Sequence, residues 1–179
     1  MKKFISVFTA LVMLTALAVF SVPCAAESKA AFEQDGIKLD SVPEGYTVEL
    51  DKDDEGIRYL TIGPDDSANP VFFVSVTPLD DELAMLAELS ADMTDEKLSE
   101  YADYFIEDYN EPSVHIAETE HGSPLLVIDE NGDDGDNGEI IGLHNGYIID
   151  LAIVSLSEDP LDEKDFELGI KILSDLWVE

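Results

Sequence analysis

The side chains best able to do chemistry gather in an acidic, glycine-rich segment, residues 129–139, which reads DENGDDGDNGE. Calcium is held by roughly six to eight oxygens from carboxylates, amides and carbonyls. Asp129, Asn131 and Asp133 have the spacing of the first, third and fifth ligand positions of an EF-hand loop, and Asp136 offers a further carboxylate. The segment therefore predicts a candidate calcium site formed by Asp129, Asn131, Asp133 and Asp136.

The match to an EF-hand loop is partial. The sixth position calls for glycine and is Asp134, and the twelfth calls for glutamate and is Ile140. The pattern before the loop predicts a strand where an EF-hand has a helix. A solvated connection between two strands is therefore the alternative interpretation, because connections run over the surface and tolerate polar, glycine-rich sequence.

Histidine is the second residue type that suggests a metal. His115 and His121 are close in sequence to Glu118 and Glu120, and zinc takes three or four such ligands when they converge in space. The same residues are predicted to lie along one strand, which separates the two imidazoles by roughly 20 Å. Surface histidines are the expectation, and His144 is grouped with them.

No motif predicts an enzyme. Paired carboxylates carry no information in a chain with 41 acidic residues. A Gly-x-Ser-x-Gly nucleophile elbow and a glycine-rich phosphate loop with its lysine are both missing from the sequence. We therefore assign no catalytic or cofactor-binding residue and expect a non-enzymatic binding or accessory domain. A calcium-dependent module and a hydrolase that uses carboxylates are the alternatives.

The charge balance narrows the class of partner. The chain has 9 basic and 41 acidic residues, for a formal net charge of −32. Nucleic acid and anionic membrane surfaces are disfavoured, because binding to phosphate needs a basic surface. High solubility explains this charge without any partner, whereas a functional interpretation is attraction of cations or of a basic partner. We expect a monomer that binds an unidentified protein or small ligand.

The first 26 residues predict export. Lys2 and Lys3 precede an apolar run over residues 4–20, and small residues up to Ala26 follow, which is the layout of a bacterial-type signal peptide. Cleavage after Ala26 would leave residues 27–179 as one secreted domain without cysteine or a transmembrane segment. An uncleaved anchor and a lipoprotein acylated at Cys24 are the alternatives, although Pro23 does not suit lipidation.

The elements that must position these residues follow from periodicity. Alternation predicts a hairpin of residues 46–50 and 57–62, and the run 71–76 predicts a central strand covered on both faces. Apolar spacing predicts a short helix over residues 80–89 and a longer one that starts after Thr94 and stops before Pro112.

The second half predicts a meander and a closing helix. Strands are expected at residues 113–120, 125–128, 139–144 and 147–156, with a type I′ turn at Asn145-Gly146. Residues 162–177 have one apolar stripe typical of a helix, and Gly169 on it would allow close approach to the sheet. The core is expected to include the aromatic residues Phe72, Phe73, Phe105 and Trp177.

Together these elements predict an α+β fold, a mainly antiparallel sheet with two principal helices packed on it. The Pro-x-Gly-Tyr opening at Pro43, Gly45 and Tyr46, with this element order over residues 36–178, resembles the PsbP-like family. That family includes photosystem II extrinsic proteins and a Ran-binding nuclear import factor. The resemblance implies an accessory or binding role without catalysis, and it transfers no functional residue to this chain.

Overall fold

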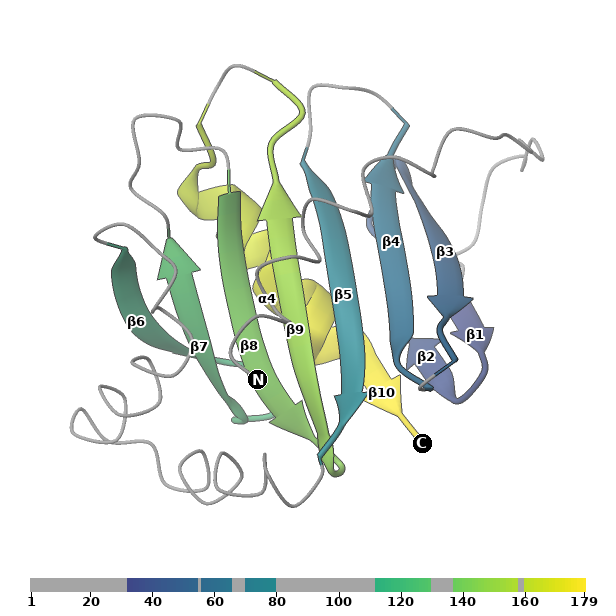
Figure 1. The fold of residues 1–179 in the computed structure, drawn as a ribbon. Coiled ribbons are helices and arrows are strands. Elements are labelled where there is room, and N and C mark those ends of the chain that lie inside the picture. Colours follow the sequence, from purple (N-terminus) through teal and green to yellow (C-terminus); the bar gives the residue numbers. More distant parts are fainter. Residues whose placement is uncertain (1–31, 55, 66–69, 80–111, 130–136, 158–159) are drawn as a thin grey trace.

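The computed structural model describes residues 32–54, 56–65, 70–79, 112–129, 137–157 and 160–179. These residues form two antiparallel sheets and one helix. The helix and the smaller sheet lie on the same side of the larger sheet (Figure 1).

The larger sheet has seven strands in the order β3-β4-β5-β9-β8-β7-β6. All of its pairs are antiparallel, so neighbouring strands are joined mostly by hairpins. This confirms the first hairpin, the interior position of β5 and the four-strand meander. The strands are β3 (Tyr46–Lys52), β4 (Arg58–Pro64), β5 (Val71–Pro78), β6 (Ser113–Glu118), β7 (Pro124–Asp129), β8 (Asn137–His144) and β9 (Tyr147–Val154).

Two hairpins have two-residue turns with left-handed backbone angles, and the sequence predicts the first of them. Asn145 and Gly146 join β8 to β9 with φ of 48° and 82°, the left-handed values that a type I′ turn requires. Asp35 and Gly36 have φ of 49° and 75° and join the first two strands of the smaller sheet. That sheet has the order β1-β2-β10, with β1 (Phe32–Gln34), β2 (Ile37–Leu39) and β10 (Leu176–Val178).

Helix α4 (Glu163–Asp175) begins with a capping box. Asp162 accepts hydrogen bonds from the first-turn amides, and the Asp165 carboxylate accepts from the Asp162 amide, so free donors at the helix start are satisfied. The helix ends at Asp175, two residues earlier than expected, because Leu176 turns extended and the chain pairs with β2. The prediction that residues 176 and 177 are helical is therefore wrong.

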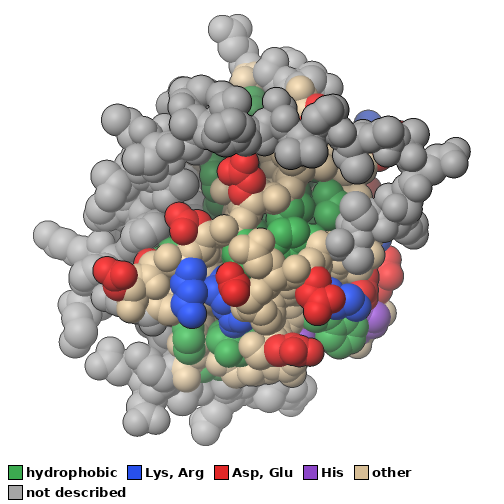
Figure 2. All heavy atoms as spheres, turned by 90° about the vertical axis from the view of Figure 1, so that its right-hand side faces the viewer, with side chains coloured by type: hydrophobic (Ala, Val, Ile, Leu, Met, Phe, Trp, Pro, Cys, Tyr) green, Lys and Arg blue, Asp and Glu red, His purple; other side chains and the backbone are tan. Residues whose placement is uncertain are grey.

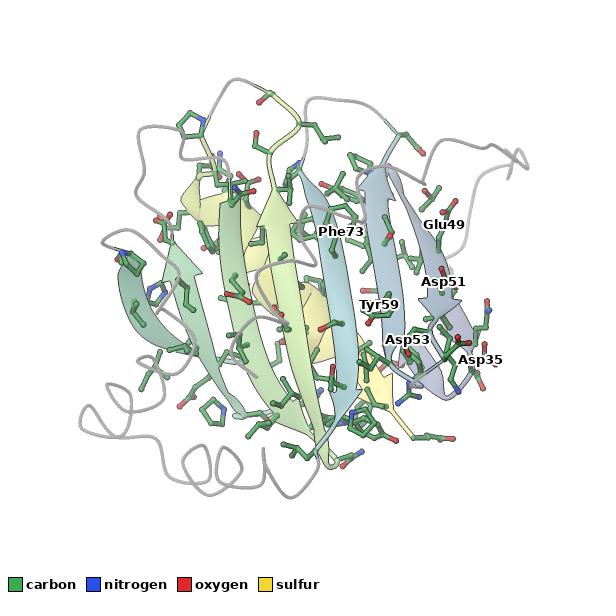
Figure 3. All side chains as sticks on the ribbon, viewed as in Figure 1. Asp35, Glu49, Asp51, Asp53, Tyr59 and Phe73 are labelled. Atoms are coloured by element: carbon green, nitrogen blue, oxygen red, sulfur yellow. The ribbon has the colours of Figure 1, made fainter. Side chains whose placement is uncertain are left out.

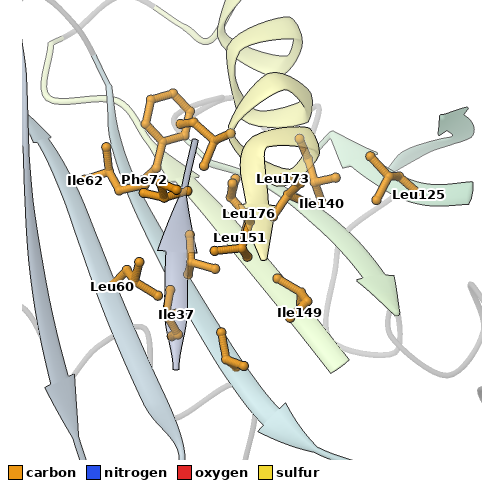
Figure 4. Close-up of a cluster of buried hydrophobic side chains, with 14 of the residues drawn as sticks. Ile37, Leu60, Ile62, Phe72, Leu125, Ile140, Ile149, Leu151, Leu173 and Leu176 are labelled. Atoms are coloured by element: carbon orange, nitrogen blue, oxygen red, sulfur yellow. The ribbon is translucent and has the colours of Figure 1, made fainter. Parts of the chain in front are cut away.

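The core lies between the seven-stranded sheet and the layer made of α4, β2 and β10 (Figure 4). Alternate residues of β4, β5, β8 and β9 point into it, and Phe72 is its largest fully buried side chain. Burying such a side chain contributes roughly 1.5–3 kcal/mol. The opposite face of β7 and β8 also carries fully buried side chains, namely Leu126, Ile128 and Ile141.

Gly169 sits where α4 crosses the sheet, as the sequence predicts. A Cβ built on Gly169 would lie 2.8 Å from Cδ1 of Ile140 and 3.2 Å from Cδ1 of Ile153. Real Cβ atoms do not approach a carbon so closely, and the missing side chain lets the helix contact β8 and β9.

The predicted fold class needs correction. An α+β fold with two principal helices is wrong, since the described residues hold ten strands and a single helix. The antiparallel sheets carry most of the packing, so the α+β class is only loosely compatible. The helices expected over residues 80–89 and after Thr94, together with Phe105, fall outside the described residues.

The predicted signal peptide also falls outside the described residues. Within the described ranges, no helix is both long enough and apolar enough to cross a membrane.

Candidate functional site

Trp177 is the residue whose position departs most from expectation. It was predicted to be buried, but its side chain is 39 % exposed, and only Leu156 is another exposed large apolar residue in the described ranges. Strand alternation explains the difference: Leu176 and Val178 point into the core, so Trp177 between them must point outward. Phe72 is buried as predicted, while Phe73 on the opposite sheet face is half-buried.

Two imidazoles lie against the Trp177 indole. The ring centroid of His121 is 5.6 Å from that of the indole, and the ring of His144 stands edge-on at 5.9 Å. The indole N–H donates a 2.7 Å hydrogen bond to Asp40, which also forms an ion pair with Lys38. The indole is therefore held in place along its polar edge.

Beside this cluster the surface opens into a cleft of about 160 Å³. Its floor is apolar and consists of buried side chains, while Trp177, the two histidines and small hydroxyl residues form its rim. The floor residues are Leu125, Ile149, Leu173 and Leu176.

Topology brings the rim residues together from distant parts of the sequence. In an antiparallel meander every second turn lies at the same end of the sheet. The β6–β7 turn with His121 and the β8–β9 turn after His144 therefore share one end, where α4 also stops and β10 begins. The amide of Glu120 donates to Oγ of Ser174, which ties the first turn to the helix end. The predicted meander already implies that the turn with His121 and the turn after His144 lie at the same end of the sheet. Considering His115 and His121 as a metal-binding pair overlooked this proximity of His121 to His144.

The electrostatics of the rim follow from burial and from its few charges. Partial burial lowers the pKa of His144 below 6.5, and the neighbouring His121 lowers it further because two cations repel. Hydrogen bonds from Lys38 and Trp177 lower the pKa of the Asp40 carboxyl. At neutral pH His144 is therefore neutral and Asp40 is charged.

The predicted calcium ligands are only partly visible. Asp129 ends β7, and Asn131, Asp133 and Asp136 lie outside the described residues. Asp129 lines a second cleft of about 340 Å³ together with His115 and residues from the start of α4, including Asp162, Glu163 and Glu167. Within the described ranges, no three histidine or acidic residues are close enough together to hold a metal ion.

A buried pair of carboxyl groups lies on the sheet face that α4 does not cover. Asp150 on β9 and Glu139 on β8 are linked by a hydrogen bond, and Glu139 is only 7 % exposed. Burial, followed by the charge of Glu139, raises the pKa of Asp150 well above 3.8. Oδ1 of Asp150 is inaccessible to solvent and accepts no hydrogen bond from any described residue. No signal in the sequence distinguishes this pair among 41 acidic residues.

Acidic side chains also line the edge strand β3 and the turn after it (Figure 3). Glu49 and Asp51 are exposed on the face opposite the core, and Asp53 accepts a 3.0 Å hydrogen bond from the Tyr59 hydroxyl. Charges on an edge strand discourage pairing with other chains. This arrangement therefore has a structural explanation that requires no ligand.

Comparison with known proteins adds no relative: no family model matches the chain, and no curated protein matches it. The resemblance to the PsbP-like family stays a prediction based on element order.

Proposed function

We propose that this chain is an exported, non-enzymatic binding domain that holds one compact apolar group in the cleft beside Trp177. The observation that carries the proposal is the cleft itself, an apolar hollow of about 160 Å³ under an exposed indole. Exposed aromatic side chains next to apolar hollows are typical of sites that bind partners.

The size of the cleft sets the size of the group. A cavity of about 150 Å³ lined by aliphatic side chains accommodates benzene, whereas sites for drug-sized ligands begin at about 300 Å³. The Trp177 cleft therefore suits a single leucine-sized or phenyl-sized group. A drug-sized ligand would exceed it.

The hydroxyl groups of the cleft favour binding over catalysis. Ser174 donates to the carbonyl of Ile170 and accepts from the amide of Glu120, so its oxygen is engaged on both sides. Thr119 accepts from the amide of Ser123. The imidazoles of the rim contact the indole rather than an activated nucleophile.

Trp177 makes a direct test possible, because it is the only tryptophan in the chain. Its fluorescence should shift to the blue and saturate when the protein is titrated with benzyl alcohol or 3-methylbutan-1-ol, since the ligand displaces water from the indole. Ser123→Leu, which adds a leucine side chain at the rim, should abolish the response.

Ser113→Leu is the matched control, because Ser113 is exposed at the far end of β6 from the cleft. Circular dichroism and melting temperatures should show that both variants are folded. A response that rises linearly without saturation, or that is equal in both leucine variants, would exclude a binding site at Trp177.

A further inference from the structure

We propose that the natural occupant of the Trp177 cleft is a leucine-sized or phenyl-sized side chain in a protein segment rich in lysine or arginine. This inference rests on the proposed function and adds the chemical class of the partner. It is carried by the charges around the cleft and by the geometry of β10.

The rim carries more negative than positive charge. Asp40 bonds the indole itself, Glu120 precedes His121, and Asp175 lies between Ser174 and Leu176 of the cleft lining. Glu179 is exposed on the same side of β10 as Trp177, since the two residues are separated by two positions in a strand. Four carboxylates therefore bond the cleft lining or lie within two positions of it in the sequence, and none of them is itself part of the lining.

The basic side chains near the cleft cancel only part of this negative charge. Lys38 pairs with Asp40, and Lys171 pairs with Asp175 across one helical turn. Glu120 and Glu179 form no ion pair with any described residue, and both are exposed. Their charges are available to a cationic ligand.

The two histidines complete the charge pattern. His144 is neutral at neutral pH for the reasons given above, and it therefore adds no positive charge to the rim. On the face drawn in Figure 2, acidic side chains are spread over the described surface and basic side chains lie among them. At low ionic strength the net charge of −32 attracts a cationic segment before contact.

The geometry of β10 indicates that the partner contributes side chains rather than a new strand. Asp175 and Glu179 form main-chain hydrogen bonds with Asp40 and Gly36. Because bonding alternates along an antiparallel strand, the main-chain N–H and C=O groups of Leu176 and Val178 point away from β2. The carbonyl of Val178 already accepts a 3.1 Å bond from the side chain of Asn145. One acceptor on the outer edge of β10 is thus already engaged, which favours insertion of a side chain over pairing with a new strand.

Capped pentapeptides test the proposal by Trp177 fluorescence. We expect KKLKK to bind on the order of tenfold more tightly than GGLGG in about 20 mM salt, because several exposed charge pairs each add a small amount. The difference should disappear in about 500 mM salt, where the screening length is only a few ångströms. EELEE should bind more weakly than GGLGG.

The variant Glu120→Gln/Glu179→Gln should weaken binding of KKLKK several-fold and leave GGLGG unchanged. Glu49→Gln is the control, because it removes an exposed charge on the opposite face of the sheet. Equal affinities for KKLKK and EELEE would overturn the charged-partner inference while the apolar cleft stands. Equal affinities for KKLKK and KKGKK would overturn the proposed function, since the leucine would then add nothing.

Discussion

At the scale of single residues, burial and the neighbouring Glu139 raise the pKa of the Asp150 carboxyl well above 3.8. Its environment favours the protonated form, because burial disfavours a second negative charge next to Glu139. A carboxyl whose pKa is raised in the folded state holds its proton more tightly than in the unfolded chain. Its contribution to stability is therefore complete below the unfolded value of 3.8 and is lost as the pH rises through the raised folded pKa.

Asp150→Asn is expected to stabilise the protein at pH 7. The asparagine side-chain amide resembles the protonated carboxyl. It is neutral and can donate a hydrogen bond to Glu139 without taking up a proton. The gain in the free energy of unfolding should be at least about 1 kcal/mol, since one pKa unit corresponds to roughly 1.4 kcal/mol. Urea denaturation followed by Trp177 fluorescence measures this gain. The free energies of unfolding of the wild type and the variant should become equal below pH 4.

Asp51→Asn is the matched control, because Asp51 is exposed on β3. It should change the free energy of unfolding by no more than about 0.5 kcal/mol. A loss of stability at pH 7 in Asp150→Asn would show that the charged form of Asp150 is the one the fold prefers.

A second prediction at this scale concerns His144. Removing the repulsion from His121 by His121→Asn should raise the pKa of His144, which NMR titration of the imidazole protons measures. The pKa should stay below 6.5, because partial burial is the larger cause of the lowering and is still present. His115→Asn, on the exposed face of β6, should leave the titration of His144 unchanged.

An unchanged titration of His144 in His121→Asn would mean that His121 does not lower the pKa of His144, and that the two imidazoles only contact the same indole. The sign of the stability effect follows from the lowered pKa. The unfolded chain binds the His144 proton more tightly, so this residue reduces stability as the pH falls below 6.5.

At the scale of elements, the apolar stripe predicted α4 well and misplaced only its end. Helical spacing cannot tell where pairing with another strand becomes more favourable than one further helical turn. Asp175 shows the competition directly, because its carbonyl accepts a hydrogen bond from the amide of Asp40, the residue just after β2. The residues Leu-Trp-Val also suit a strand. The exposure of Trp177 follows from this change of element.

The contact of α4 with the sheet gives a prediction in which two effects oppose each other. Gly169→Ala should gain about 1 kcal/mol from helix propensity. Overpacking against Cδ1 of Ile140 should cost roughly 1–3 kcal/mol. We therefore expect a net loss of about 1 kcal/mol in the free energy of unfolding, measured by urea denaturation.

Ile140→Val tests the cause of that loss, because it deletes the Cδ1 atom that a Cβ at Gly169 would meet. The double variant should be more stable than the sum of the two single changes predicts, as expected for residues in contact. If the two substitutions have additive effects on the free energy of unfolding, the loss in Gly169→Ala does not come from contact with Cδ1 of Ile140.

At the scale of the whole molecule, the acidic loop still predicts a calcium site. Calorimetric titration of the chain with calcium should show saturable heat and a higher melting temperature. Asp133→Asn/Asp136→Asn should remove both effects, while Glu44→Gln/Glu49→Gln, an equal change in charge at exposed sites, should not. Magnesium at the same concentration should give a weaker effect, because it demands stricter octahedral geometry.

An equal response to magnesium and calcium, or an equal response in both double variants, would mean that divalent ions only screen the net charge of −32. In that case the loop is a solvated connection between β7 and β8.

By itself the sequence determined the strands of the larger sheet, the Asn145-Gly146 turn, the start of α4 and the acidity of the chain. These features depend on neighbours within a few positions, such as alternation, a capping aspartate or an Asn-Gly pair. Only the tertiary structure decided that His121, His144 and Trp177 share one cleft and that the carboxyl groups of Asp150 and Glu139 are buried side by side. Those contacts depend on which strands become neighbours and where a helix gives way to a strand. Both outcomes are set by packing between distant segments, and no local pattern records them.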